Sequence, residues 1–210
     1  MTRELTRPVT SLADLQALYG EPTPNAARKQ IDRLDDHCRD FIARSPFALL
    51  ATSDAAGRCD VTPRGGTPGF VHVLDEQRLA IPDVRGNNRT DALRNLLVNP
   101  HAGLLFLIPG LGETLRVNGQ ASLTRDAGLL GELAHAGRVP TLAIVVEAQE
   151  VFLHCAKAFL RSGLWRPGEW PPGDDLPSAA RILRDHTGRT DRSVEDVQGD
   201  LDVSYTTRMY

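Results

Sequence analysis

The chain is short of cysteine and has no surplus of basic charge, and each shortage excludes a class of protein. Its three cysteines, Cys38, Cys59 and Cys155, have no C-x-x-C spacing, so neither a disulfide framework nor a zinc site is predicted. We expect buried free thiols and no metal site. The formal net charge of -3 argues against nucleic acid as a partner, because binding to a phosphate backbone needs a basic surface.

Long apolar runs are also missing. No stretch approaches the roughly 18 apolar residues of a membrane span, and the first twenty residues lack the apolar segment of a signal peptide. The composition, 41% hydrophobic and 24% charged, is that of a folded globular chain. We therefore expect a cytoplasmic protein that does not contact membranes.

Lysine is nearly absent. Of the 24 Lys and Arg residues only Lys29 and Lys157 are lysines, which leaves 22 arginines. A guanidinium group binds phosphate or carboxylate through two parallel hydrogen bonds, although codon usage explains much of this bias equally well. Only arginines in a special local context therefore indicate a site.

Three enzyme signatures are absent: a G-x-G-x-x-G loop after a strand, a Walker lysine loop and a G-x-S-x-G elbow. Their absence lowers the expectation of a dinucleotide fold, a nucleotide triphosphatase or a serine hydrolase.

The apolar pattern predicts an α+β fold that is mainly β, with peripheral helices. Residues 1–40 read as an N-terminal helical arm. An amphipathic helix that begins at Asn25 runs out of this arm and ends before Pro46. Residues 41–165 hold six or seven strands in two hairpin groups, which favour a closed or split antiparallel barrel. Residues 166–210 read as a loop and short helices. The expected strands cover residues 47–54, 59–63, 69–75, 79–83, 101–108, 113–123 and 141–154.

Two segments carry features of an anion site. Arg64 and Gly65 follow a strand in V-T-P-R-G-G, where a cation lies beside exposed backbone N–H groups; a solvated turn arginine is the equal alternative. Asn87, Asn88 and Arg89 precede a helix, with Asn88 as the expected N-cap. Ordinary capping by Asn88 and Asp91 explains part of that pattern, but it does not explain a cation at the positive end of a helix.

Two further segments carry polar faces. Strand alternation places Thr114, Arg116 and Asn118 on one face, which is either wet or lines a ligand cavity. Helical spacing of i, i+4 and i+8 places Lys157, Arg161 and Trp165 together, as a clamp for a phosphorylated ring or as a solvent-facing stripe.

Taken in order, these motifs resemble the pyridoxamine 5'-phosphate oxidase-like FMN-binding split-barrel family, in its branch of probable FMN-dependent flavoproteins. The resemblance runs from about Phe41 to about Trp165. It rests on the combination PRG, GNNR-x-D-x-L-x-N, NP-x-x-G-L-L-F, ETLRVNG and HC-x-KA-x-x-RS-x-LW.

The resemblance implies a homodimer of six-stranded split barrels, with FMN in a cleft between subunits. By the same resemblance the cofactor-binding residues are Arg64, Gly65, Asn87, Asn88, Arg89, Thr114, Arg116, Lys157, Arg161 and Trp165. Arg64, Asn88 and Arg89 would together hold the phosphate. The last three of the set would come from the other subunit, and Arg116 would lie near the N1 and C2 carbonyl edge of the flavin. No catalytic side chain is assigned.

The implied function is that of an FMN-dependent oxidoreductase acting on an unknown small molecule. The chain lacks the R-x-H motif and the closing R-L-x-P of the vitamin B6 oxidases, so their substrate is not inherited with the fold. The alternatives are a flavin store without turnover and a haem-binding split barrel using His72, His101 or His154. The deazaflavin cofactor F420 remains an alternative to FMN.

Overall fold

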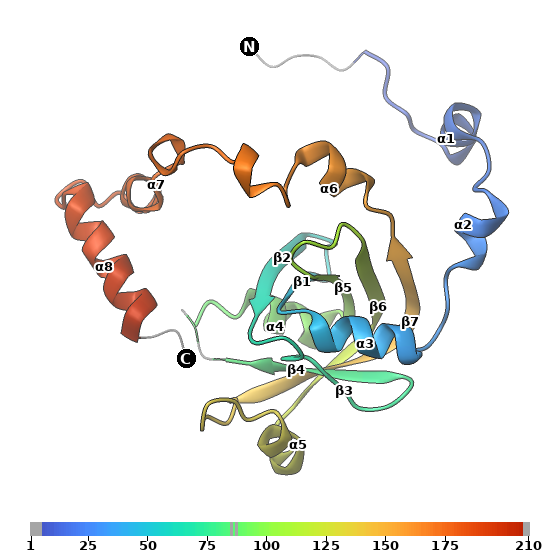
Figure 1. The fold of residues 1–210 in the computed structure, drawn as a ribbon, viewed down its shortest axis with the longest axis horizontal. Coiled ribbons are helices and arrows are strands. Elements are labelled where there is room, and N and C mark those ends of the chain that lie inside the picture. Colours follow the sequence, from blue (N-terminus) through green and yellow to red (C-terminus); the bar gives the residue numbers. More distant parts are fainter. Residues whose placement is uncertain (1–5, 85, 87, 208–210) are drawn as a thin grey trace.

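The computed structural model describes residues 6–84, 86 and 88–207 (Figure 1). Its strands form an antiparallel sheet in the order β2-β1-β5-β6-β7-β4-β3. The predicted α+β class is confirmed, with seven strands rather than six because the short β3 adds to one edge of the sheet. The strands are β1 (Phe47–Ser53), β2 (Cys59–Gly65), β3 (His72–Val73), β4 (Arg78–Asp83), β5 (His101–Leu107), β6 (Thr114–Thr124) and β7 (Leu142–His154).

The sheet curls because its two longest strands bend. β6 and β7 pair along their whole length, with a register shift between Asn118 and Gly119. A bulge of this kind bends the strand and increases its twist. Gly119 is required at this point, since a Cβ atom there would collide with the carbonyl oxygen of Glu147. The bend brings the two ends of the sheet toward each other as a split barrel.

One face of the curled sheet forms the core. Ala48, Leu50, Leu104 and Phe106 alternate along β1 and β5 and are at most 1% exposed. Two helices cover this face, α3 (Asp36–Arg44) and α4 (Asp91–Val98), the second with Ala92 and Leu96 buried. Each fully buried large apolar side chain contributes roughly 1.5–3 kcal/mol of hydrophobic stabilisation.

The helix expected from Asn25 is broken into two. α2 (Pro24–Arg28) ends early, and α3 begins only after Asp35, whose carboxylate accepts a hydrogen bond from the Cys38 amide at 2.9 Å. Between them Ile31 pairs with Val151 of β7 through hydrogen bonds of 2.9 and 2.8 Å. The prediction was wrong because this long-range strand pairing outweighs local helical periodicity.

The expectation of buried thiols holds for one cysteine of three. Cys38 lies in the core, where burial raises the pKa of its thiol to about 12. Cys59 and Cys155 are exposed, since Cys59 lies on the outward side of an edge strand and Cys155 follows the end of β7.

The terminal segments extend beyond the barrel in Figure 1. α1 (Leu12–Tyr19) buries none of its residues. After β7 come α6 (Lys157–Ser162), two single 3-10 turns, and the helices α7 (Ala179–His186) and α8 (Val194–Thr207), which pack on each other. One further helix, α5 (Ala127–Glu132), lies between β6 and β7. No helix in the described part of the chain is long and apolar enough to cross a membrane.

Candidate functional site

An ion pair joins β2 to β4, which are not neighbours in the sheet. Arg64 Nη1 donates to Asp83 Oδ1 at 2.8 Å, and each side chain is only 18% exposed. β2 is one edge of the sheet, and β4 lies next to the opposite edge. The pair therefore holds the two ends of the barrel together by side chains rather than by backbone pairing.

Three polar side chains follow one another on the inward face of β2. Asp60, Thr62 and Arg64 alternate with exposed residues, and Arg64 lies directly opposite the buried Ala48. Asp60 Oδ2, Thr62 Oγ1 and Arg64 Nε are buried and have no hydrogen-bond partner among the described residues. An unsatisfied buried polar atom costs about 1–3 kcal/mol. Three in one row indicate a place where a polar ligand binds.

Sequence reasoning missed Asp60 and Thr62. A signal is present in the sequence, since D-x-T-x-R alternates in β2 as T-x-R-x-N does in β6 and places the three polar residues on one face.

The start of α4 lies near this row. α4 packs against β1 and β2, and Asn95 Nδ2 donates to Thr52 Oγ1 at 3.0 Å. Arg89 forms an ion pair with Asp91, which raises the pKa of the guanidinium, and the charge of Asp60 raises it further. Arg89 is therefore within electrostatic reach of the Asp60 end of β2.

The expected N-cap was wrong. The N-cap of α4 is Thr90, not Asn88, and no side chain of the described residues caps the helix. Asn88 and Thr90 both have left-handed backbone, with φ of 61° and 54°, so Asn88 lies outside the helix. Asp91, the other expected cap, is engaged by Arg89. Among the residues that the structure describes, the amides of this first turn thus have no side-chain acceptor, which is the condition for an anion site. Asn87 lies outside the described residues.

Thr114, Arg116 and Asn118 share one face of β6, as predicted. Arg116 is paired in register with Leu105 on one side and Phe152 on the other, all three half-buried. This is the outer face of the sheet, whereas Arg64 points to the inner face. Within one chain the structure therefore does not bring Arg116 together with Arg64.

Arg116 belongs to a polar and aromatic cluster on that outer face. Its Cζ lies 4.3 Å from the Phe152 ring centroid and its Nη2 lies 3.5 Å from Glu150 Oε1. Lys29 Nζ is 4.8 Å from the same ring centroid, and the His154 ring is 4.9 Å away. Burial lowers the pKa of His154, and the charges of Arg116 and Lys29 lower it further. Arg116 Nε is buried without a hydrogen-bond partner among the described residues.

The predicted clamp is only partly helical. Lys157 and Arg161 are exposed on α6, but the helix ends at Ser162 because Gly163 is left-handed. Trp165 lies beyond the helix and stacks on Phe159 with ring centroids 5.5 Å apart. Its Nε1 donates to the Leu111 carbonyl at 2.8 Å. The expected i, i+8 relation was therefore wrong for Trp165, because a helix of six residues cannot reach it.

Arg64 and Gly65 also line a cavity of about 660 Å³, which lies beyond the end of β2. Across the described residues, no cluster of three or more His, Cys, Asp and Glu side chains is arranged to hold a metal ion.

The family follows from a match over residues 34–155 to the family model described as pyridoxamine 5'-phosphate oxidase. This match covers more than half of the chain, and the chain therefore belongs to that family, as its motifs predicted. None of the curated proteins compared with the chain matches it.

Several solved structures are similar to part of this chain at low sequence identity. A putative pyridoxamine 5'-phosphate oxidase from Lactobacillus delbrueckii is 21% identical, with a TM-score of 0.46 over 58% of this chain and 95% of its own. HupZ from Group A Streptococcus is 16% identical, with a TM-score of 0.47 over 57% and 92%. An FMN-binding protein from Syntrophomonas wolfei is 11% identical, with a TM-score of 0.44 over 56% and 83%.

Proposed function

We propose that the chain is an FMN-binding flavoprotein and an FMN-dependent oxidoreductase acting on a small molecule. The observation that supports this most is the row of buried polar atoms on β2, which have no hydrogen-bond partner among the described residues and lie near a helix start that no described side chain caps. A flavin mononucleotide offers hydroxyl groups and a phosphate, which match donors and acceptors of this kind.

The residues divide between the two ends of such a ligand. Asp60 and Arg64 are four residues apart on one strand, a separation of roughly 13 Å. Arg89 lies near the Asp60 end, so we assign Asn88 and Arg89 to the phosphate. Thr62 and Asp60 would bind the polyol chain, and Arg64 with Gly65 would border the ring. This differs from the expectation that Arg64 and Arg89 share one phosphate.

A homodimer would complete the site. The outer face of β1, β5 and β7 presents apolar side chains that are only half-buried, as at protein interfaces. Five predicted site residues lie on this face or in the segment that follows it. The proposal assigns them to the cleft between subunits: Thr114, Arg116, Lys157, Arg161 and Trp165. The apolar outer residues are Phe47, Leu49, Ala51, Leu105, Leu107 and Phe152.

The chemistry belongs to the cofactor, which when bound supplies a hydride acceptor at N5. The side chains of this protein bind and orient it. Arg116 would favour negative charge at the N1 and C2 carbonyl edge through the guanidinium of its side chain, which is 39% exposed. No side chain is assigned as an acid or base.

The test is the identity of the chromophore of the purified protein. We expect flavin absorption bands, and mass spectrometry of the released pigment should give the mass of FMN. A mass of F420 would retain the oxidoreductase class and change the cofactor. A Soret band, or failure of FMN to bind the purified protein, would overturn the proposal. Anaerobic bleaching by NADH or NADPH and fast reoxidation by an added acceptor would distinguish an enzyme from a flavin store.

A further inference from the structure

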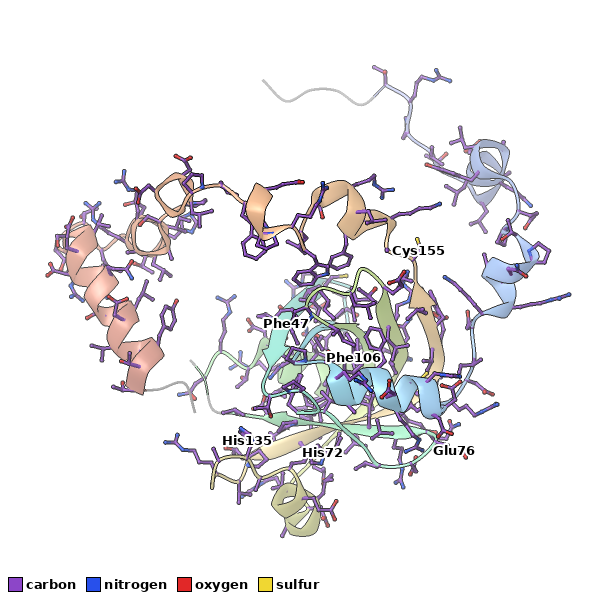
Figure 2. All side chains as sticks on the ribbon, in the orientation of Figure 1. Phe47, His72, Glu76, Phe106, His135 and Cys155 are labelled. Atoms are coloured by element: carbon purple, nitrogen blue, oxygen red, sulfur yellow. The ribbon has the colours of Figure 1, made fainter. Side chains whose placement is uncertain are left out.

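The cavity next to Arg64 is large enough for a small molecule. It opens between the end of β2 with its following loop, the end of β4, and the segment that joins α5 to β7, and its volume of about 660 Å³ lies in the usual range of ligand sites. Figure 2 shows His72 and His135 on the same side of the barrel, and both line this cavity. Its apolar walls include Phe70, Val84, Leu133 and Val139.

The charged side chains of the described lining are both cationic. These are Arg64 and Arg138; the described lining also contains His72 and His135 and no aspartate or glutamate, although the chain as a whole has a net charge of -3. Asp83 already pairs with Arg64. The side chain of Arg138 is exposed and makes no hydrogen bond or ion pair with any described residue. Among the described lining residues, Arg138 is therefore the cation that remains available to a ligand.

A tight turn holds Arg138 beside His135. The amide of each donates to the carbonyl of the other, at 3.0 and 2.9 Å, and the two central residues, Ala136 and Gly137, have φ of 50° and 77°. Positive φ at both positions is typical of a type I′ hairpin turn. Directly opposed residues of such a pair project to the same side, with Cα atoms about 5.5 Å apart. The turn thus presents an arginine and a histidine together at the edge of the cavity.

We propose that this cavity is the substrate site, and that the substrate is a small molecule with an apolar body and one anionic group, a carboxylate or a phosphate, bound by Arg138 beside His135. The apolar walls bind the apolar part of the substrate, and the turn that carries Arg138 binds its anionic group. This inference rests on the proposed flavin function, because Arg64 both ends the polar row of β2 and lines the cavity. A substrate there would lie next to the ring end of the flavin site.

Binding of simple probes tests the inference. Benzoate and phenyl phosphate carry the two anions, and benzamide is a neutral probe of similar shape. Calorimetric titration would be done on FMN-loaded protein, with wild type, Arg138→Gln and Arg125→Gln. Arg125 is an exposed arginine outside the cavity, so its variant matches the change in net charge.

We expect at least one anionic probe to bind more tightly than benzamide. Arg138→Gln should weaken binding of that anionic probe roughly tenfold, which is the effect of one lost hydrogen bond to a charged group. The affinities for benzamide and FMN should not change. Arg125→Gln should change nothing. Equal binding of anionic and neutral probes, or equal losses in both variants, would overturn the inference.

Two outcomes separate the substrate site from the flavin site. If the anionic probe binds only the cofactor-free protein and added FMN displaces it stoichiometrically, the cavity is the flavin's own site, and the inference fails while the proposed function stands. If the chain binds no FMN, the titration is repeated on the cofactor-free protein. If Arg138→Gln still weakens binding of the anionic probe to this protein, the result supports an anion site in the cavity. In that case only the flavin proposal is overturned.

Discussion

Arg64 of β2 and Asp83 of β4 form an ion pair of 2.8 Å across the split of the barrel, between strands at opposite ends of the sheet order. Both side chains are largely buried, so water screens the pair only in part. It fixes the distance between the polar row of β2 and the strand that leads to α4. The pair thus contributes to stability and to the shape of the candidate site.

Asp83→Asn should lower the free energy of unfolding by about 1–3 kcal/mol, because it leaves the Arg64 guanidinium partly buried without its anion. Arg64→Gln should have a similar cost, because it leaves the Asp83 carboxylate partly buried without its cation. Urea denaturation of both variants and of the double variant forms a double-mutant cycle. If the losses in unfolding free energy of the two single variants add up to the loss in the double variant, Arg64 and Asp83 do not stabilise the protein through each other.

Arg89→Ala should weaken FMN binding by about 1.5–3 kcal/mol, the usual contribution of a hydrogen bond to a charged group. Its ion pair with Asp91 is exposed, so thermal stability without cofactor should change little. Quenching of flavin fluorescence measures the dissociation constant. Arg125→Ala, an exposed arginine at a distance from α4 in the chain, is the control, and equal losses in both would mean that only general charge attracts FMN.

Thr62→Val should act with opposite signs on the two forms of the protein. The Thr62 hydroxyl is buried without a partner among the described residues, so replacing it with a methyl group of similar size should maintain or raise the stability of the cofactor-free protein. With FMN the same change should cost about 0.5–1.5 kcal/mol of binding free energy. Melting curves with and without saturating FMN measure both effects. A less stable cofactor-free variant would show that the hydroxyl already has an internal partner.

The strands were predictable because their signals are local. β1 and β5 are short apolar runs and β7 is rich in Val and Ile, so their predicted bounds agree with the structure to within a residue or so. The errors arose where contacts with distant parts of the chain determine the local conformation. Ile31 leaves the predicted helix to pair with Val151, and Asn88 takes a left-handed conformation that helical periodicity does not reveal.

The candidate site was predictable only in part for the same reason. Arg64 and Arg89 could be selected as cations next to glycine or a helix start. The partner of Arg64 could not be predicted, because Asp83 lies 19 residues further along the chain, on a strand that is not a neighbour of β2 in the sheet. Opposite faces of the sheet likewise separate Arg116 from Arg64, which becomes visible only from the register of all the strands.

The proposed dimer can be tested at Leu105, which lies at the middle of the apolar outer face between Leu49 and Arg116. Leu105→Glu places a charge where the partner subunit would exclude water. An unpaired buried interface charge costs about 2–5 kcal/mol, so the dimer dissociation constant should rise by at least roughly thirtyfold. Sedimentation velocity over a range of protein concentrations measures this. Leu97→Glu, at an exposed leucine of α4, is the matched control and should leave the dimer intact. A wild-type chain that stays monomeric at high concentration, or equal dissociation of both variants, would contradict an interface on this face.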